Sequence, residues 1–143
     1  MTGSDLVRHW FHNLWELGNE STIDECLAPG MVVRGLAEAD LVGREQFRAF
    51  YRSFRAAFPT IRVNLERVLE SGEFVTCLAR AELYSADGRG PFRIYGSATV
   101  RVEDGMFVEG WNSWDFLSLL MQMGHVRPDA MAVALTEPAI PVR

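Results

Sequence analysis

The sequence predicts an α+β domain in which N-terminal helices pack on one face of a strongly curved, mainly antiparallel sheet. Two observations predict this class. Apolar residues recur every three or four positions across residues 4–57, as on one face of a helix, and after Pro59 the period changes to two, as in strands. Because the helical segments come first and long strands follow as a meander, the layout is that of an α+β protein.

Three helices are expected before Pro59. They run from Ser4 to a stop at Gly18-Asn19, from a cap at Ser21 or Thr22 to Pro29-Gly30, and from Arg44 to Ala57. Between the second and the third, Met31–Val33 is predicted to be a short buried strand and residues 35–43 a polar loop. The third helix carries an aromatic stripe, which needs the face of a sheet to cover it.

Four long strands are expected after Pro59. Their predicted ranges are 62–70, 73–85, 92–103 and 106–114. Asp104-Gly105 joins the last two strands and is a strong hairpin signal. Asp115 then begins a last helix that ends at Gly124.

The chain has 143 residues, of which 48% are hydrophobic and 23% charged. This length suits one domain, so we expect a single domain over residues 1–143 with a core near residues 5–125 and a loosely held tail over 127–143. The start of the chain lacks the cationic and apolar segments of a signal peptide, and no run reaches the roughly 18 apolar residues of a membrane span. We therefore expect a cytoplasmic protein.

Charge and composition exclude several functions. The net charge of −5 disfavours binding to nucleic acid or to an anionic membrane, because no excess of cations can replace phosphate counterions. All 14 cationic residues are arginines, so a lysine Schiff base is excluded. His9 and His12 lie far in sequence from His125, and Cys26 and Cys77 form no CxxC pair, so we expect no metal site and two small buried thiols.

The inner face of the predicted sheet combines small and large residues. If Asn112 faces inward, alternation gives Val108, Gly110 and Trp114 the same face, with Ala98 inward on the preceding strand. Small side chains opposite an aromatic helix stripe leave room for a flat, hydrophobic ligand. The alternative is that the small residues only allow the third helix to pack closely.

The stretch Trp111-Asn-Ser-Trp-Asp-Phe-Leu-Ser-Leu-Leu-Met-Gln-Met-Gly124 resembles the closing signature of the SnoaL-like polyketide cyclases, in the NTF2-like superfamily. In that signature, a strand ends in an aromatic and acidic cluster and a helix of the form D-F-x-x-x-L-x-Q-L-G follows. Four further segments fall at the family's usual spacings: 28–31, 43–47, 56–59 and 101–105. The resemblance covers residues 5–125 and implies a cone-shaped α+β barrel, in most members a dimer.

The resemblance also implies a chemistry. Family members act without a cofactor on polycyclic polyketides, and the best-known activity is an intramolecular aldol ring closure that uses an aspartate, a histidine and an asparagine. These fall here on Asn112, Ala98 and Val33. An amide has no titratable proton near neutral pH, so Asn112 cannot replace the aspartate as general acid or base. It can still donate a hydrogen bond to a developing enolate or carbonyl oxygen.

Three residues are therefore candidates for catalysis. Besides Asn112, they are Asp115, the nearest carboxylate, and Tyr51, whose hydroxyl can polarise a substrate. For Asp115 the alternative is an N-cap of the following helix, and for Tyr51 it is core packing. The residues expected to bind substrate are Phe11, Trp15, Met31, Phe47, Phe50, Phe54, Ala98 and Trp114.

The leading hypothesis is a cofactor-independent SnoaL-like cyclase that promotes ring closure of a hydrophobic polyketide-type small molecule. The alternatives are a cofactor-independent hydroxylase of the same family, or a ligand-binding or dimerising NTF2-like protein without catalysis. Trp111 is predicted to face outward, which favours a homodimer through that surface.

Overall fold

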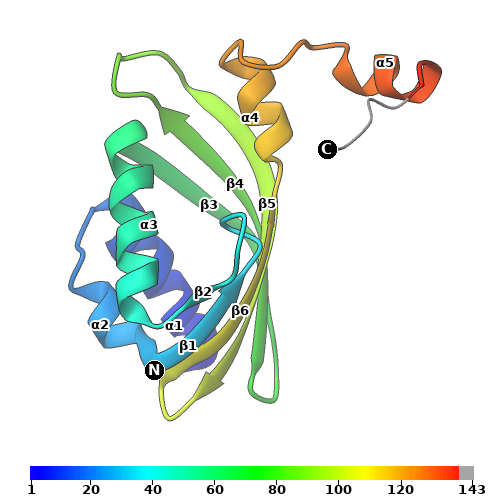
Figure 1. Ribbon diagram of the computed structural model, residues 1–143. Coiled ribbons are helices and arrows are strands. Elements are labelled where there is room, and N and C mark those ends of the chain that lie inside the picture. Colours follow the sequence, from blue (N-terminus) through cyan, green and yellow to red (C-terminus); the bar gives the residue numbers. More distant parts are fainter. Residues whose placement is uncertain (139–143) are drawn as a thin grey trace.

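Residues 1–138 are described by the structure, a computed structural model, and they form helices laid against one curved sheet (Figure 1). The elements are, in chain order, α1 (Gly3–Trp10), the π-helix η1 (Phe11–Glu16), α2 (Thr22–Cys26), β1 (Leu27–Arg34), β2 (Leu41–Val42), α3 (Arg44–Ala57), β3 (Thr60–Ser71), β4 (Phe74–Tyr84), β5 (Phe92–Glu103), β6 (Met106–Trp114), α4 (Phe116–Gln122) and α5 (Ala130–Thr136). The strand order is β2-β1-β6-β5-β4-β3, and among these neighbours β1 and β6 pair in parallel. The predicted α+β class is confirmed. The sheet is not closed, because β2 and β3 remain as edges.

The first predicted helix is confirmed, and it begins with a capping box. Thr2 Oγ1 accepts a hydrogen bond from the Asp5 amide at 3.1 Å, and Asp5 Oδ2 accepts one from the Thr2 amide at 2.9 Å. The helix continues directly into η1 and stops at Gly18, whose φ of +72° suits a residue without a Cβ. Its apolar stripe is buried at Leu6, Val7, Trp10, Phe11, Leu14 and Trp15.

The boundary between α2 and β1 differs from the prediction. Helix α2 ends at Cys26 instead of continuing to Pro29-Gly30, and β1 begins immediately, at Leu27. The reason is a parallel pairing, in which Leu27 lies beside Phe107 and the end of β1 runs along β6. Local sequence does not reveal a partner so distant in the chain. The two-residue strand β2 also lies in the segment that was predicted to be a loop.

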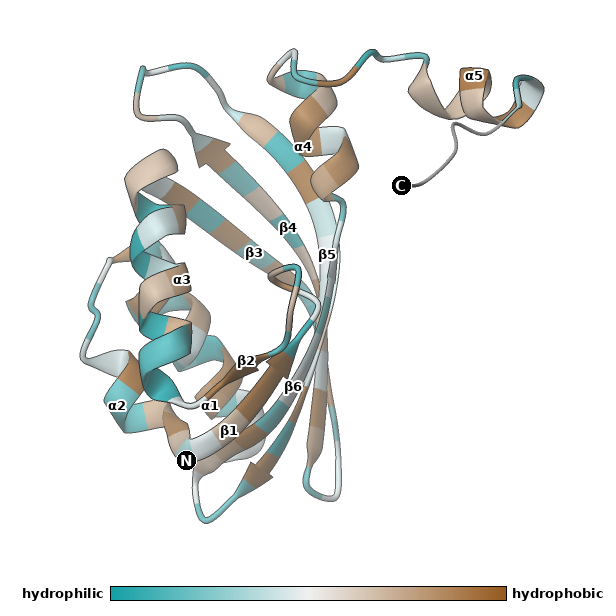
Figure 2. Ribbon diagram, viewed as in Figure 1, coloured by the Kyte–Doolittle hydropathy of each residue, from teal (hydrophilic) through white to brown (hydrophobic). Residues whose placement is uncertain are grey.

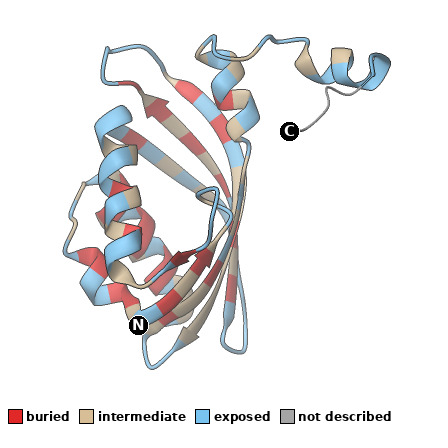
Figure 3. Ribbon diagram, in the orientation of Figure 1, coloured by how far each residue is buried: buried red, intermediate tan, exposed pale blue. Residues whose placement is uncertain are grey.

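The long strands follow the predicted alternation. The bounds of α3, β5 and β6 are as predicted, and those of β3 and β4 differ by one or two residues at each end. Buried and exposed residues alternate along β4 and β5 (Figure 3), and hydrophobic and hydrophilic residues alternate with them (Figure 2). One face of the sheet therefore meets the helices, and the other faces away from them.

A β-bulge in β6 corrects one detail of the predicted inner face. The pairing shifts between Arg101 and Val102, so that Arg101 pairs with Glu109 but Val102 pairs with Phe107. Val108 is thus the extra residue, and Phe107 takes the inward position that alternation assigned to Val108. Phe107 is buried and lies edge-on to Trp10, with ring centroids 5.6 Å apart.

The two C-terminal helices differ in how they contact the rest of the molecule. Helix α4 packs at the end of β5, and α5 extends away from the body of the molecule (Figure 1). No residue of α5 is buried, and its helical structure was not predicted. Residues 139–143 of the predicted tail lie outside the described residues. Within residues 1–138, no helix combines the length and the hydrophobicity needed to cross a membrane.

Candidate functional site

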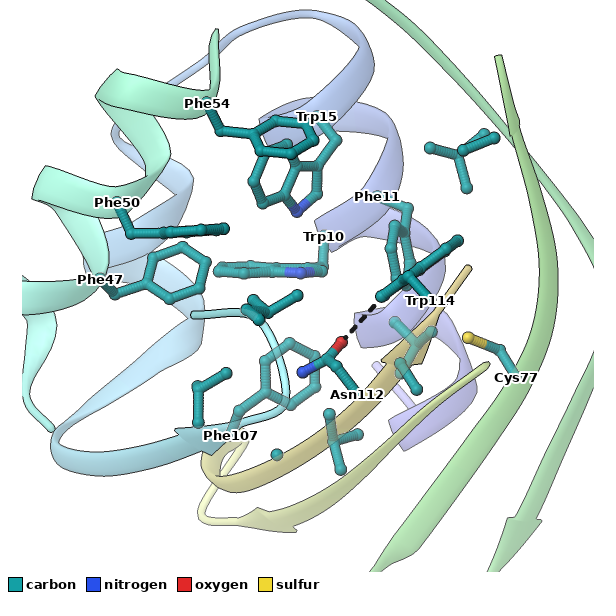
Figure 4. A pocket seen from close by; sticks show the side chains of 18 of the residues that line it. Trp10, Phe11, Trp15, Phe47, Phe50, Phe54, Cys77, Phe107, Asn112 and Trp114 are labelled. Atoms are coloured by element: carbon teal, nitrogen blue, oxygen red, sulfur yellow. Dashed lines mark hydrogen bonds between the residues drawn. The ribbon is translucent and has the colours of Figure 1, made fainter. Parts of the chain in front are cut away.

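A cavity of about 100 Å³ lies between the helices and the inner face of the sheet. Its walls are almost entirely apolar (Figure 4). The eight residues predicted to bind substrate all line it, namely Phe11, Trp15, Met31, Phe47, Phe50, Phe54, Ala98 and Trp114. Sequence reasoning did not single out several further lining residues, among them Trp10, Leu36, Phe107 and Phe116.

The helix side of the cavity is a cluster of interlocked aromatic rings. Trp10 and Phe47 have ring centroids 5.3 Å apart, and Trp15 meets Phe54 edge-on at 5.6 Å. Offset and edge-to-face contacts of this kind each add roughly 0.5–1.5 kcal/mol beyond the burial of apolar area. Phe54 also reaches Phe116 at the start of α4, at 6.5 Å. The rings therefore form a wall with a defined shape.

The sheet side of the cavity carries smaller side chains. The inward residues include Cys77 and Ala81 on β4, Ala98 on β5 and Gly110 on β6. Cys77 is 1% exposed and free, and burial raises the pKa of its thiol, so it stays protonated near neutral pH. Small residues against a rigid aromatic wall leave the space that the sequence predicted.

The three positions to which the resemblance assigns catalytic residues meet in this cavity. Ala98 and Asn112 are direct partners on β5 and β6, and Val33 pairs with Gly110. All three line the cavity, and Asn112 alone of them is polar. The structure therefore brings the positions together, while two of the family's three functional side chains are replaced by apolar ones.

Asn112 is held by two hydrogen bonds. Its Nδ2 donates to the backbone oxygen of Arg34 at 3.3 Å, and its Oδ1 accepts from Trp114 Nε1 at 3.3 Å (Figure 4). An amide carries two N–H groups, so one N–H of the half-buried Asn112 is left for a ligand. Gly35, directly after β1, allows the chain to pass close to β6, because a Cβ at this position would lie 1.9 Å from the Asn112 backbone oxygen.

Trp114 is placed by a glycine on the neighbouring strand. Gly96 pairs with Trp114, and a Cβ on Gly96 would lie 2.2 Å from the indole ring. The ring thus lies flat against the Gly96 backbone, and Phe11 meets it at 6.2 Å from the helix side. This packing directs the indole N–H toward Asn112, whose side-chain oxygen accepts its hydrogen bond.

Glu109 is the one carboxylate among the described residues around the cavity, but it pairs with Arg101, and alternation with Gly110 places its side chain on the outer face of the sheet. Its two oxygens accept hydrogen bonds from Arg34 Nη1 at 3.1 Å and from Arg101 Nε at 2.9 Å. The hydrogen bond from Arg101, with a smaller contribution from Arg34, lowers the pKa of Glu109 below its ordinary value. An ionised carboxylate bound to two guanidinium groups is a poor proton acceptor for a substrate.

Tyr51 and Asp115 do not line the cavity, contrary to the predicted shared site with Asn112. Tyr51 is buried behind the aromatic wall, where its hydroxyl donates to the backbone oxygen of Leu14 at 2.9 Å and burial raises its pKa. Asp115 Oδ1 accepts from the Ser118 amide at 3.0 Å, which is the N-cap geometry given above as its alternative. Both groups use their hydrogen-bonding capacity within the fold.

The histidines lie elsewhere. His9 Nε2 contacts Glu25 at 3.1 Å and His12 Nδ1 contacts Glu16 at 3.1 Å, both on the outer side of the helices. Among residues 1–138, no three histidine, cysteine or acidic side chains are grouped so that they could hold a metal ion.

An open, curved sheet wrapped around aromatic helices, with one amide in an apolar cavity, defines an α+β domain with room for a small apolar ligand. A family model described as the SnoaL-like domain matches residues 7–110, and the chain belongs to this family. No curated protein sequence matches the chain.

Solved structures share the fold. IdmH from Streptomyces antibioticus, an inferred polyketide cyclase, is 24% identical with a TM-score of 0.73, over 87% of this chain and 99% of that one. An inferred SnoaL-like polyketide cyclase from Jannaschia sp. CCS1 is 22% identical with a TM-score of 0.74, over 87% and 92%. AclR from Streptomyces galilaeus, an inferred hydroxylase, is 15% identical with a TM-score of 0.70, over 86% and 96%.

Proposed function

We propose that this SnoaL-like protein is a cofactor-independent cyclase that promotes ring closure of a hydrophobic, polyketide-type substrate. The observation that carries the proposal is the free N–H of Asn112 in an otherwise apolar, aromatic cavity. Such a site binds flat rings and offers one directional contact to an oxygen atom.

The size of the cavity limits how the substrate sits. About 100 Å³ is of the order of the cavity that holds one benzene ring, roughly 150 Å³ in an engineered case. One ring of a substrate would fill it, and the remainder would extend past the partly exposed residues Leu36, Phe50 and Phe116. A linear, partly cyclised chain suits this arrangement, because its reactive end can fold back into the cavity.

The chemistry assigned to this site is positioning plus polarisation. In an aldol closure, an enol carbon bonds to a ketone carbon of the same molecule, and the ketone oxygen gains the negative charge. The Asn112 N–H would donate to that oxygen, and the proton from the enol would reach it through water at the open side of the cavity. Restraint of the folded chain can lower such a barrier by several kcal/mol, about 7–11 at the limit, and a placed donor adds about 3.

The experiment is turnover of a tricyclic aromatic polyketide that carries an enolisable side chain and a ketone. We expect an Asn112→Leu variant to lose about a hundredfold in kcat, because the donor to the oxyanion is removed at nearly constant shape. Tyr51→Phe is the control and should retain wild-type kcat, since Tyr51 does not line the cavity.

The mass of the product separates the alternatives. Cyclisation conserves the mass of the substrate or removes one water, whereas hydroxylation adds one oxygen atom and requires O₂. A product that gains oxygen, or binding of the polyketide with no product at all, would contradict the cyclase.

We further propose that the chain forms a homodimer through the outer face of the sheet. This face exposes five large apolar side chains, which are Leu69, Phe74, Leu78, Tyr95 and Trp111. Exposed apolar patches of this kind are typical of protein interfaces. Leu78→Asp should raise the dimer dissociation constant about tenfold or more in sedimentation equilibrium, and Leu120→Asp, an exposed position on α4, should not. A wild-type chain that remains monomeric at every concentration would overturn this proposal.

A further inference from the structure

A second hollow lies on the side of the sheet opposite the cavity. It is lined by Arg62, Val63, Asn64, Arg80 and Glu82, from the paired ends of β3 and β4. Arg62 pairs with Glu82 and Asn64 pairs with Arg80, so alternation places all four on the outer face. On β5, Arg93 lies next to Glu82 in the register and extends the same row. We call these outward residues the outer niche: Arg62, Asn64, Arg80, Glu82 and Arg93.

The outer niche is strongly cationic in a chain whose net charge is −5. It holds three guanidinium groups and one carboxylate, and that carboxylate is shared with Arg93 at 3.6 Å. Arg62 and Arg80 form no ion pair and no side-chain hydrogen bond with any residue in the described range 1–138. By contrast, Arg101 on the same face contacts Glu73, Glu103 and Glu109.

Arg80 carries the most specific observation. Its Nε is shielded from solvent and has no hydrogen-bond acceptor among the described residues. A buried donor on a charged group that lacks an acceptor is destabilising, and such groups in folded proteins almost always have a partner. The guanidinium is planar and offers paired N–H groups whose geometry matches two oxygens of an oxyanion.

We propose that the outer niche is a binding site for an oxyanion, a phosphate or a carboxylate group. Its oxygens would accept hydrogen bonds from Arg80 and Arg62, with the Asn64 amide as a further donor, and its charge would be balanced by the guanidinium groups that Glu82 leaves uncompensated. The site is separated from the cavity by the sheet itself. It therefore stands independently of the cyclase proposal and is tested without any turnover.

The test is a titration of the ¹⁵N-labelled chain with inorganic phosphate at constant ionic strength, with chloride as the balancing salt, observing the Arg80 Nε–Hε signal by NMR. We expect a saturable downfield shift. Acetate in a parallel titration distinguishes the two sources: saturation by phosphate alone assigns a phosphate group, and saturation by both assigns a general oxyanion site.

Matched variants separate a built site from general attraction. Arg80→Gln should weaken phosphate binding about tenfold or more, measured calorimetrically, because the paired N–H groups of the guanidinium and its positive charge are lost. Arg67→Gln removes the same charge from β3 outside the niche and should change affinity less than about twofold. Within residues 1–138, the Arg67 side chain donates one hydrogen bond, to the neighbouring Glu66 backbone oxygen. Circular dichroism of both variants checks that the sheet is retained.

Three results would overturn the proposal. The first is a chemical shift that changes linearly with phosphate, without saturation, and equally in the wild type and both variants. Such a response would come from charge screening alone. A second is equal loss of affinity in Arg67→Gln and Arg80→Gln. The third is an Arg80 signal that responds to protein concentration but not to phosphate or acetate, which would make a second copy of this chain the source of the acceptor.

Discussion

The two faces of one sheet differ in what their side chains do. On β4, Cys77 is 1% exposed and lines the apolar cavity, while its neighbour Leu78 is 50% exposed on the outer face. The inner face is occupied by small and apolar residues around Asn112, and the outer face carries arginines, glutamates and exposed apolar residues. The same alternation thus leaves an apolar cavity on one side and a charged, partly apolar surface on the other.

The largest effect on stability is expected when one carboxylate is placed on each face of the sheet in turn. Cys77→Asp should destabilise the fold by about 3–5 kcal/mol, because an unpaired carboxylate would be buried among apolar groups. Leu78→Asp should change the free energy of unfolding by less than about 0.5 kcal/mol. Urea denaturation at concentrations where both variants are monomeric measures the difference. Similar losses in the two variants would mean that the faces are not distinct.

Alanine substitutions at two glycines test how closely the inner face is packed. Gly96→Ala should cost about 1–3 kcal/mol, because its Cβ would meet the Trp114 ring at 2.2 Å. Gly110→Ala should be close to neutral, since the nearest atom to its added Cβ lies 3.7 Å away, in Val33. Thermal denaturation gives both values, and Trp114 fluorescence should change only in the first. The reverse order of stabilities would show that Trp114 is not packed on Gly96.

Tyr51 tests whether a polar group behind the cavity is structural. Tyr51→Phe removes the hydrogen bond to the Leu14 backbone oxygen and leaves a buried acceptor unsatisfied, so we expect a loss of about 1 kcal/mol in chemical denaturation. Ligand affinity should be unchanged. A Tyr51→Phe variant that keeps wild-type stability but binds the ligand more weakly would show that Tyr51 contributes to binding.

The smallest expected effect concerns the ion network of the outer face. The pKa of Glu109 in the folded chain lies below its ordinary value of 4.5. Its ion pairs therefore stabilise the fold above about pH 4.5, and this contribution is lost as the pH falls through the folded pKa. The difference in melting temperature between wild type and Glu109→Gln should be present at pH 7 and should vanish on acidification. A difference that is independent of pH would contradict this assignment.

Much of the fold follows from local pattern. Helix α3 and strands β5 and β6 have the predicted bounds, because an aromatic stripe with a period near four residues and strict alternation are unambiguous. Asn112 faces the cavity, as the alternation predicted, and the eight residues expected to bind substrate line it, although their role in binding stays a prediction. The strand residues among them follow from a period of two and the helix residues from a period near four.

The misses have a common cause, which is long-range pairing. The end of α2 at Cys26 depends on the parallel contact of β1 with β6, and the inward position of Phe107 depends on a bulge at Val108. The hydrogen bond of Tyr51 to Leu14 depends on how α3 crosses η1. None of these is encoded in a short window of sequence. The resemblance to the SnoaL-like family implied the cavity, and it also showed from the sequence alone that Ala98 and Val33 stand where family members carry polar catalytic residues.

The central claim, that an apolar cavity presents one amide N–H to a ring-bearing ligand, is tested most directly by titration with 2-acetylnaphthalene. This probe has two fused rings and one carbonyl oxygen, and naphthalene is its matched control without the oxygen. We predict a saturable shift of the Asn112 side-chain N–H in NMR with the ketone alone, and a roughly tenfold weaker affinity for naphthalene. An Asn112 signal that does not move while the ketone binds elsewhere on the chain would contradict the account.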